Sequence, residues 1–245
     1  MNLENQSYLE NLRAFDEKPE KQTSFKALFI FALSLIIFVL TALGFLDTLS
    51  TYVSHYLLRQ LGYTNKWSLW YGPEWFIGIN RDVAALAGLP VLLTFMTIIL
   101  IYYNLRKQSK RLWRLVFIIV GGGLILLIAK YFFAPDVQSE QFDFFNATEY
   151  KLPSGHAMMG TIFYLTLAVT ISRRQHSSKT KRLTIISGVV LIILIGISRI
   201  LPGIHSLKDV VAGWSLGLVW LCLCWFVERY IKKASDLQKR SQQVL

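Results

Sequence analysis

PSGH at residues 153–156 and SRILPGIHSLKD at residues 198–209 are the two polar clusters that decide the fold of this chain. Two long apolar runs, joined by a basic turn, connect them. Two successive helices that cross a bilayer return the chain to the side on which it started, so both clusters are expected at one membrane face. Since the clusters hold two histidines, an arginine and a carboxylate, this arrangement predicts a shared site that acts on a phosphate.

Both clusters resemble signature motifs of the type 2 phosphatidate phosphatase superfamily, whose members are integral-membrane lipid phosphatases. The family patterns are P-S-G-H and S-R-x5-H-x3-D, and the chain matches both at full length and in the same order. The likeness extends over roughly residues 80–230. It implies an enzyme that removes phosphate from a membrane lipid phosphate or diphosphate through a phosphohistidine intermediate, without a metal ion or another cofactor.

The composition independently favours a membrane protein. Hydrophobic residues make up 53% of the 245 residues and the mean hydropathy is +0.43, whereas soluble domains average about 45–50% apolar residues. The formal net charge is +11, and the basic residues gather at the ends of apolar runs, which is typical of contact with lipid headgroups and not with nucleic acid. Cys222 and Cys224 lie inside an apolar run and are expected to pack there without a disulfide.

Six apolar runs are long enough to cross a bilayer as helices, so the chain is expected to be an all-α, polytopic membrane protein. They lie near residues 26–46, 83–104, 113–133, 155–172, 183–201 and 208–230. We expect one membrane domain over residues 26–230, with cytoplasmic tails at residues 1–25 and 231–245. The glycines at 121–123, 213 and 217 are expected to let helices approach one another closely.

Charged residues in the loops predict the orientation in the membrane. Residues 105–114, residues 173–182 and the tail after residue 228 are basic, whereas acidic residues dominate 134–152. The positive-inside rule therefore places both termini in the cytoplasm and the two motifs on the opposite, periplasmic or extracellular, face of a membrane that we expect to be a bacterial inner membrane. The outer segment 47–82 is rich in aromatic residues and is expected to anchor at the interface, with a lid over the lipid headgroup as the alternative.

His205 is the expected nucleophile, because a neutral imidazole nitrogen can attack phosphorus and form a phosphohistidine. Asp209 follows one helical turn later and could fix the tautomer of His205 through the other ring nitrogen, although such a pair taken alone could simply cap the last helix. His156 is the expected general acid. A histidine pKa near 6.5 suits the donation of a proton to the leaving group and its later removal from water.

Three further residues of the two motifs are expected to bind phosphate. Ser154 and the N–H group of Gly155 precede a predicted helix start, where free N–H groups and the helix dipole attract an anion. Arg199 offers a planar fork of donors that matches phosphate oxygens, although an arginine at the end of an apolar run can also extend to the interface without such a role.

The first motif of the family, K-x6-R-P, is incomplete in this chain. Lys130 matches its lysine and is expected to bind phosphate, but Val137 and Gln138 replace its arginine and proline. Lys151 and Arg81 are candidates to supply the missing charge.

The incomplete motif keeps a second class of function open, in which the protein binds a lipid phosphate with little or no turnover. Phosphotransfer to a lipid acceptor is a related alternative. A secondary transporter is less well supported, because the sequence has neither an inverted repeat nor a pair of broken helices. The soluble vanadium haloperoxidases share the anion-site pattern, but six apolar spans argue against that class.

Overall fold

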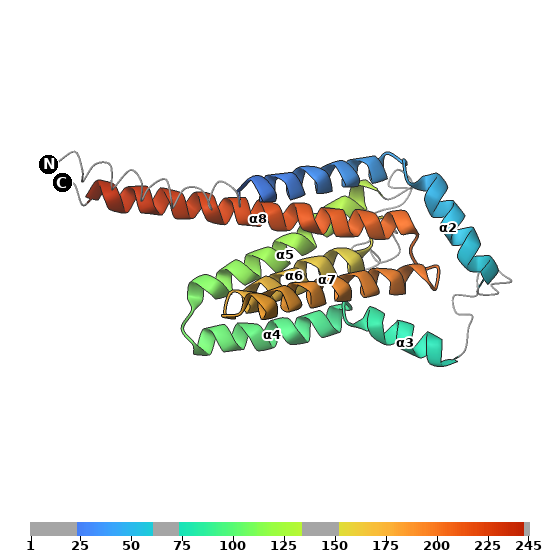
Figure 1. Ribbon diagram of the computed structural model, residues 1–245, viewed down its shortest axis with the longest axis horizontal. Helices are drawn as coiled ribbons and strands as arrows, with labels where there is room; N and C mark the ends of the chain where they lie inside the picture. The colour runs from blue at the N-terminus through green and yellow to red at the C-terminus, as the bar shows by residue number, and fades with distance from the viewer. Residues whose placement is uncertain (1–23, 61–73, 134–151, 243–245) are drawn as a thin grey trace.

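The computed structural model describes residues 24–60, 74–133 and 152–242, and every regular element in this part of the chain is an α-helix. The helices are Ser24–Ala42, α2 (Asp47–Gln60), α3 (Glu74–Ala85), α4 (Leu89–Leu105), α5 (Ser109–Phe132), α6 (Gly155–Ser172), α7 (Ser178–Ile200) and α8 (Leu207–Gln242). Most of them run along the long axis of the molecule, while α2 and α3 lie at one end (Figure 1). The predicted all-α class is confirmed.

Five of these helices are long and apolar enough to cross a membrane, and the count is six if the bent pair of α3 and α4 is one span. This agrees with the six predicted runs. Large apolar side chains are exposed along the outer faces of the helices, for example Phe29 at 60%, Phe117 at 53% and Leu183 at 64%. Water would penalise such a surface, whereas lipid tails would not. The chain is an integral membrane protein.

The second span differs from the predicted run at 83–104, because the helix breaks within it. The two helices meet at an angle of 42° across residues 86–88. Pro90 lies in the first turn of α4, where its missing N–H group is tolerated, but a helix that continued from α3 would need that group. The hydroxyl group of Tyr164 donates to the carbonyl of Leu86 over 2.7 Å and so attaches the break to α6.

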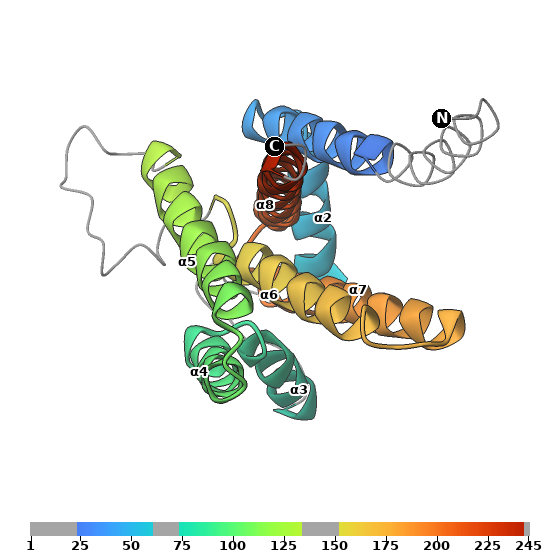
Figure 2. The same ribbon diagram turned by 90° about the vertical axis from the view of Figure 1, so that its left-hand side faces the viewer.

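The core of the bundle forms around α6, which packs against α5, α7 and α8 (Figure 2). Met158 and Ile162 on α6 are fully buried. Close helix contacts depend on glycine, as predicted: a Cβ atom at Gly213 would lie 2.6 Å from the carbonyl oxygen of Ser154, and one at Gly122 would lie 2.6 Å from the Ile162 side chain. Gly123 differs, because a Cβ atom there would have no neighbouring atom within 4 Å.

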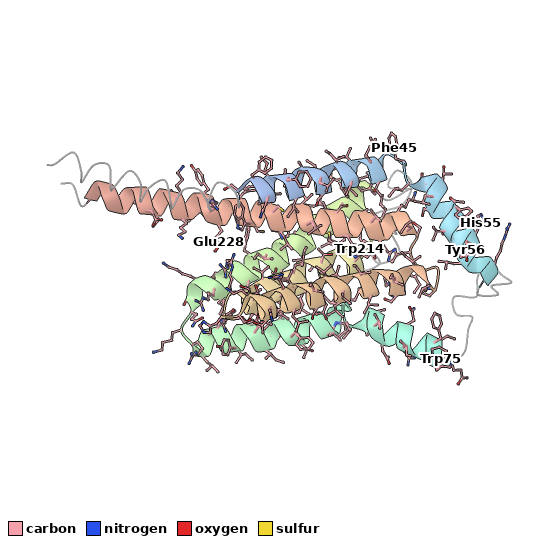
Figure 3. All side chains as sticks on the ribbon, in the orientation of Figure 1. Phe45, His55, Tyr56, Trp75, Trp214 and Glu228 are labelled. Carbon is pink, nitrogen blue, oxygen red and sulfur yellow. The ribbon has the colours of Figure 1, made fainter. Side chains whose placement is uncertain are left out.

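Trp214 of α8 points into the interior of the bundle, where its indole ring lies against Gly196 of α7 (Figure 3).

The two ends of the bundle carry different side chains. Near the end that carries the α4–α5 and α6–α7 connections, Arg114 and Glu228 form an ion pair. The opposite end carries the start of α6, the start of α8 and the ends of α5 and α7 (Figure 1). The predicted motif residues are therefore gathered at one end, away from the basic connections.

Candidate active site

The site forms around the turn that joins α7 to α8. The N–H group of His205 donates to the carbonyl of Arg199 over 3.0 Å, and the N–H group of Gly203 donates to the carbonyl of Ile200 over 2.9 Å. Gly203 has a φ of +71°, a left-handed conformation that glycine adopts without steric cost. These bonds fold the turn back on the end of α7, so that the His205 side chain is buried, with 7% exposed.

Asp209 faces His205 and also caps α8. Its Oδ2 atom accepts from the N–H group of Ser206 over 2.8 Å, and its own N–H group donates to the Ser206 hydroxyl over 3.4 Å, which is the reciprocal pattern of a capping box. The same Oδ2 atom lies 3.7 Å from Nδ1 of His205, within ion-pair range but longer than a hydrogen bond. Asp209 therefore caps α8, while its carboxylate faces His205 at ion-pair distance without a hydrogen bond to Nδ1.

The PSGH cluster meets this turn at the start of α6. The N–H group of Ser154 donates to the main-chain carbonyl of Asp209 over 2.9 Å, and the Ser154 hydroxyl accepts from the N–H group of Ala157 over 3.5 Å as the helix cap. Ser154 is fully buried, while Gly155 and His156 on the first turn of α6 are partly exposed. Two motifs that lie far apart in the sequence therefore share one backbone junction.

Two cationic side chains, Lys130 and Arg199, act electrostatically on both histidines. Lys130 at the end of α5 is 5% exposed, and Arg199 at the end of α7 is partly buried. His156 lies within electrostatic reach of Arg199, His205 and Lys130. Burial lowers the pKa of His205 below its usual value of 6.5; Asp209 opposes this effect, and the charges of Arg199 and Lys130 add to it. The His205 imidazole is therefore neutral at neutral pH, as a nucleophile requires.

The sequence profile of the PAP2 superfamily matches residues 111–233, which is half of the chain and includes both motifs. The chain belongs to the PAP2 superfamily. This confirms the resemblance that the two motifs indicated. The candidate site is built from the ends of four helices, α5 to α8, all of which begin or end within the matched residues.

Two curated relatives support this assignment. Phosphatidylglycerophosphatase B of Bacillus subtilis is 34% identical over 102 residues, which are 41% of this chain and 46% of that protein. An undecaprenyl-diphosphatase of Sulfolobus acidocaldarius is 29% identical over 125 residues, 48% of this chain and 53% of that protein. The chain thus spans about half the length of the curated relatives that it matches.

The crystal structure of a transmembrane PAP2-type phosphatidylglycerolphosphate phosphatase from Bacillus subtilis has the same fold. It superposes with a TM-score of 0.62 and 21% sequence identity, over 84% of this chain and 98% of that chain. At this identity the likeness is one of architecture.

All seven predicted site residues lie at this end of the bundle, but the incomplete first motif is only partly described. Val137, Gln138 and Lys151 lie outside the described residues. Arg81, the other candidate for the missing charge, is exposed on α3 and is not among the residues that influence the pKa of His205. Among the described residues, no group of three or more His, Cys, Asp or Glu side chains could hold a metal ion.

The structure adds contacts that the sequence did not predict. Asn80 of α3 is buried, and its Nδ2 group donates to the carbonyl of Ser198 over 3.0 Å. On the other side of the turn, Lys208 forms an ion pair with Asp47 of α2 at 2.8 Å, and its N–H group donates to the Ser50 hydroxyl over 3.3 Å. In the sequence, the partners Asn80, Asp47 and Ser50 are single polar residues in segments that the motifs do not cover.

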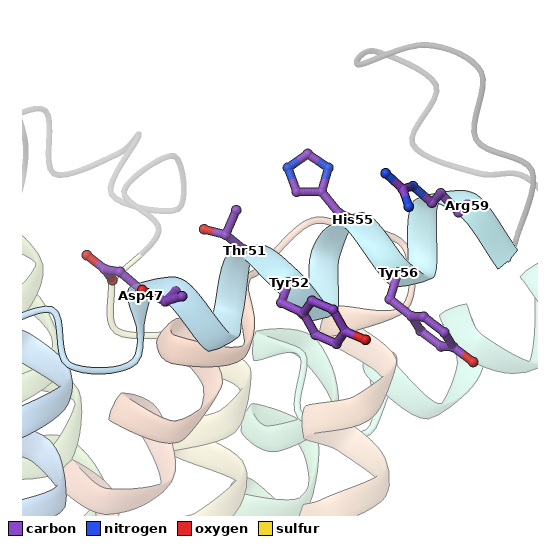
Figure 4. A pocket seen from close by; sticks show the side chains of 7 residues that line it. Asp47, Thr51, Tyr52, His55, Tyr56 and Arg59 are labelled. Carbon is purple, nitrogen blue, oxygen red and sulfur yellow. The ribbon is translucent and has the colours of Figure 1, made fainter.

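Hollows on the surface lie along α2, beside the site. One of about 780 Å³ is lined by Asp47, Thr51, His55 and Arg59 among others (Figure 4), and it includes no motif residue. His55 is exposed there. A smaller hollow of about 320 Å³ lies between α2 and the start of α8, where Ser206 and Lys208 contribute to its wall. The segment predicted as an interfacial anchor or a lid therefore contacts the turn between α7 and α8 directly.

Proposed function

We propose that this protein removes phosphate from a membrane lipid phosphate or diphosphate, with His205 as the nucleophile. The observation that carries the proposal is the meeting of His205, Asp209 and His156 with two buried or half-buried cations at one end of the bundle. The two cations neutralise the phosphate charge, and the start of α6 adds N–H donors and the positive end of a helix dipole. No metal ion is required, because these groups supply the positive charge that the transition state needs.

In the first step, the free ring nitrogen of His205 attacks phosphorus and forms a P–N bond, while the bond from phosphorus to the lipid oxygen breaks. His156, protonated at that moment, gives its proton to the leaving oxygen. Asp209 stabilises the positive charge that develops on the His205 ring, because its Oδ2 atom lies 3.7 Å from Nδ1. Lys130 and Arg199 bind the phosphoryl oxygens throughout.

In the second step, water attacks the phosphohistidine. His156, now neutral, takes one proton from this water, the P–N bond breaks, and its electron pair returns to the His205 ring. Inorganic phosphate leaves, and both histidines regain their starting protonation states. A lipid hydroxyl in the place of water would give phosphotransfer by the same steps.

The membrane setting and the relatives support a substrate class. The two curated relatives are named for their substrates, a phosphate ester of a glycerol lipid and a polyprenyl diphosphate. Each of these two substrates is a lipid that carries a terminal phosphoryl group. We propose a substrate of this kind, presented at the membrane face opposite to the basic connections. The positive-inside rule makes that face periplasmic or extracellular and places both termini in the cytoplasm.

Phosphate release by detergent-purified protein tests the proposal. Wild type and His205→Ala are compared on phosphatidylglycerol phosphate and undecaprenyl diphosphate, with melting temperature as the control for folding. Wild type should release phosphate and the variant should lose at least about 1,000-fold of that activity, since it lacks the nucleophile. Turnover that persists in a folded His205→Ala protein would exclude the mechanism.

A second candidate function is lipid-phosphate binding without turnover. It is motivated by Val137, which stands where the first family motif has an arginine. Under this alternative, both wild type and His205→Ala would bind inorganic phosphate and neither would release it from a lipid. Turnover that depends on His205 excludes the alternative.

A further inference from the structure

The carbonyl groups at the end of α7 are each satisfied by a specific donor. The last carbonyls of a helix lack the partners that the next turn would supply. Here the carbonyl of Ile197 accepts from the N–H group of Leu201 over 3.0 Å, and the carbonyls of Arg199 and Ile200 accept from His205 and Gly203. The carbonyl of Ser198 is different, because the helical donor for it would be residue 202.

Residue 202 is Pro202, which has no N–H group. Leu201 still has helical backbone angles, φ −54° and ψ −45°, so the nitrogen of Pro202 occupies the place of the next helical donor. The Ser198 carbonyl is therefore left without its usual partner inside the protein. A buried carbonyl in this position costs free energy unless another donor reaches it.

Asn80 is that donor. Its Nδ2 group donates to the Ser198 carbonyl over 3.0 Å, and both residues are buried, with 6% and 3% exposed. The Ser198 hydroxyl does not compete, because it donates to the carbonyl of Ile195 over 2.7 Å. Asn80 lies on α3, which packs against α7 and precedes the residues 111–233 that match the PAP2 profile.

The bond acts on the residue next to Ser198, which is Arg199. The main chain of Arg199 is fixed on one side by Asn80 and on the other by the N–H group of His205. The Nε atom of Arg199 is buried and has no hydrogen-bond partner among the described residues, so no bond at Nε fixes the direction of the side chain. We propose that Asn80 is a positioning residue that replaces the donor missing at Pro202 and so aims Arg199 at the substrate phosphate.

This inference about Asn80 rests on the proposed function. Its test uses the whole chain, purified in detergent. The variants are Asn80→Ala, Pro202→Ala, their combination, and Asn104→Ala, which makes the same chemical change at an exposed position of α4. The measurements are kcat and KM for release of phosphate from phosphatidylglycerol phosphate and undecaprenyl diphosphate, the Kd for inorganic phosphate, and the melting temperature.

Asn80→Ala should lower kcat/KM by about 10- to 100-fold and weaken inorganic phosphate binding about tenfold, because a small displacement of a charged clamp is costly. Pro202→Ala restores an N–H group at the helical position. The double variant should therefore fold and keep kcat/KM and phosphate affinity within about threefold of Pro202→Ala alone. Asn104→Ala should behave as wild type.

Two results would overturn the proposal. One is an Asn80→Ala protein whose kcat/KM and phosphate affinity stay within about twofold of Asn104→Ala. The other is a double variant that is no better than Asn80→Ala, which would mean that the missing donor is not the cause. If wild type binds inorganic phosphate but turns over neither lipid, the proposed function fails while phosphate affinity still tests the role of Asn80.

Discussion

The N–H group of Ser154 donates to the main-chain carbonyl of Asp209 over 2.9 Å, and through this bond the two sequence motifs form one backbone junction. Neither side chain takes part in the bond, so the side chain of Asp209 is free to cap α8 and to face His205. The junction requires α6 and α8 to approach closely. Gly213 on α8 allows this, because any Cβ atom there would lie 2.6 Å from the carbonyl oxygen of Ser154.

Gly213→Ala should therefore damage the site as well as the packing. The added methyl group meets main-chain atoms of the PSGH segment, which cannot rotate away, and such overpacking typically costs about 1–3 kcal/mol. We expect a lower melting temperature and a fall in kcat/KM of at least about tenfold. Gly123→Ala on α5 is the matched control, since nothing lies within 4 Å of its added methyl group. Equal activity of the two variants would show that the junction is not needed.

Lys130 should carry much of the phosphate binding in this chain, because the arginine that follows it in the family motif is replaced by Val137. Lys130→Met keeps the length of the side chain and removes its charge. Loss of one charge-assisted donor to a transition state costs about 100- to 1,000-fold in kcat, and we expect an effect in that range. Arg81→Met should change kcat by less than about threefold, because Arg81 is exposed on α3. The reverse order of the two effects would identify Arg81 as the substitute for the missing arginine.

The spacing of the motifs predicted that their residues lie at one end of the bundle, because helix length and membrane thickness are physical constraints that the sequence displays directly. Two spans of about 20 residues must return Arg199 and His205 to the side of His156. The structure places all three, with Lys130 and Asp209, at one end of the bundle. The cap formed by Asp209 was likewise predictable, since Ser206 and Asp209 have the spacing of a capping box.

Contacts between distant segments were not predictable in the same way. Asn80 and Ser198 are 118 positions apart, and no periodicity relates one asparagine on α3 to one carbonyl on α7. The break between α3 and α4 was missed because apolar residues continue across it, and hydropathy does not register the backbone effect of Gly88 and Pro90. Tertiary packing decides which polar residue meets which orphan carbonyl, and a single sequence does not contain that geometry.

The acid limb of the pH dependence of kcat/KM should report the protonation of His205 in the free enzyme. Its pKa lies below 6.5 because burial and the nearby cations disfavour the charged ring. The neutral form of His205 therefore persists as the pH falls through about 6.5, and the acid limb should lie below that pH. Stopped assays from about pH 4 to about pH 8, with short exposures to acid and a return to neutral pH to check recovery, measure this limb.

Two substitutions should move the acid limb in opposite directions. Lys130→Met removes a cation that lowers the pKa of His205, so the residual activity should be lost at a higher pH than in wild type. Asp209→Asn removes the carboxylate that raises this pKa, so its residual activity should persist to a lower pH. Shifts in the same direction, or no shift in either variant, would assign the limb to a group other than His205.

The orientation of the bundle can be tested with two exposed histidines at its opposite ends. His55 lies on α2 beside the site, and His176 lies in the basic connection between α6 and α7. In a background with Cys222→Ala and Cys224→Ala, a membrane-impermeant maleimide added to intact cells should label His55→Cys. It should label His176→Cys only after the membrane is made permeable, because the positive-inside rule places that connection in the cytoplasm. Labelling of His176→Cys in intact cells would invert the topology and place the proposed active site at the cytoplasmic face.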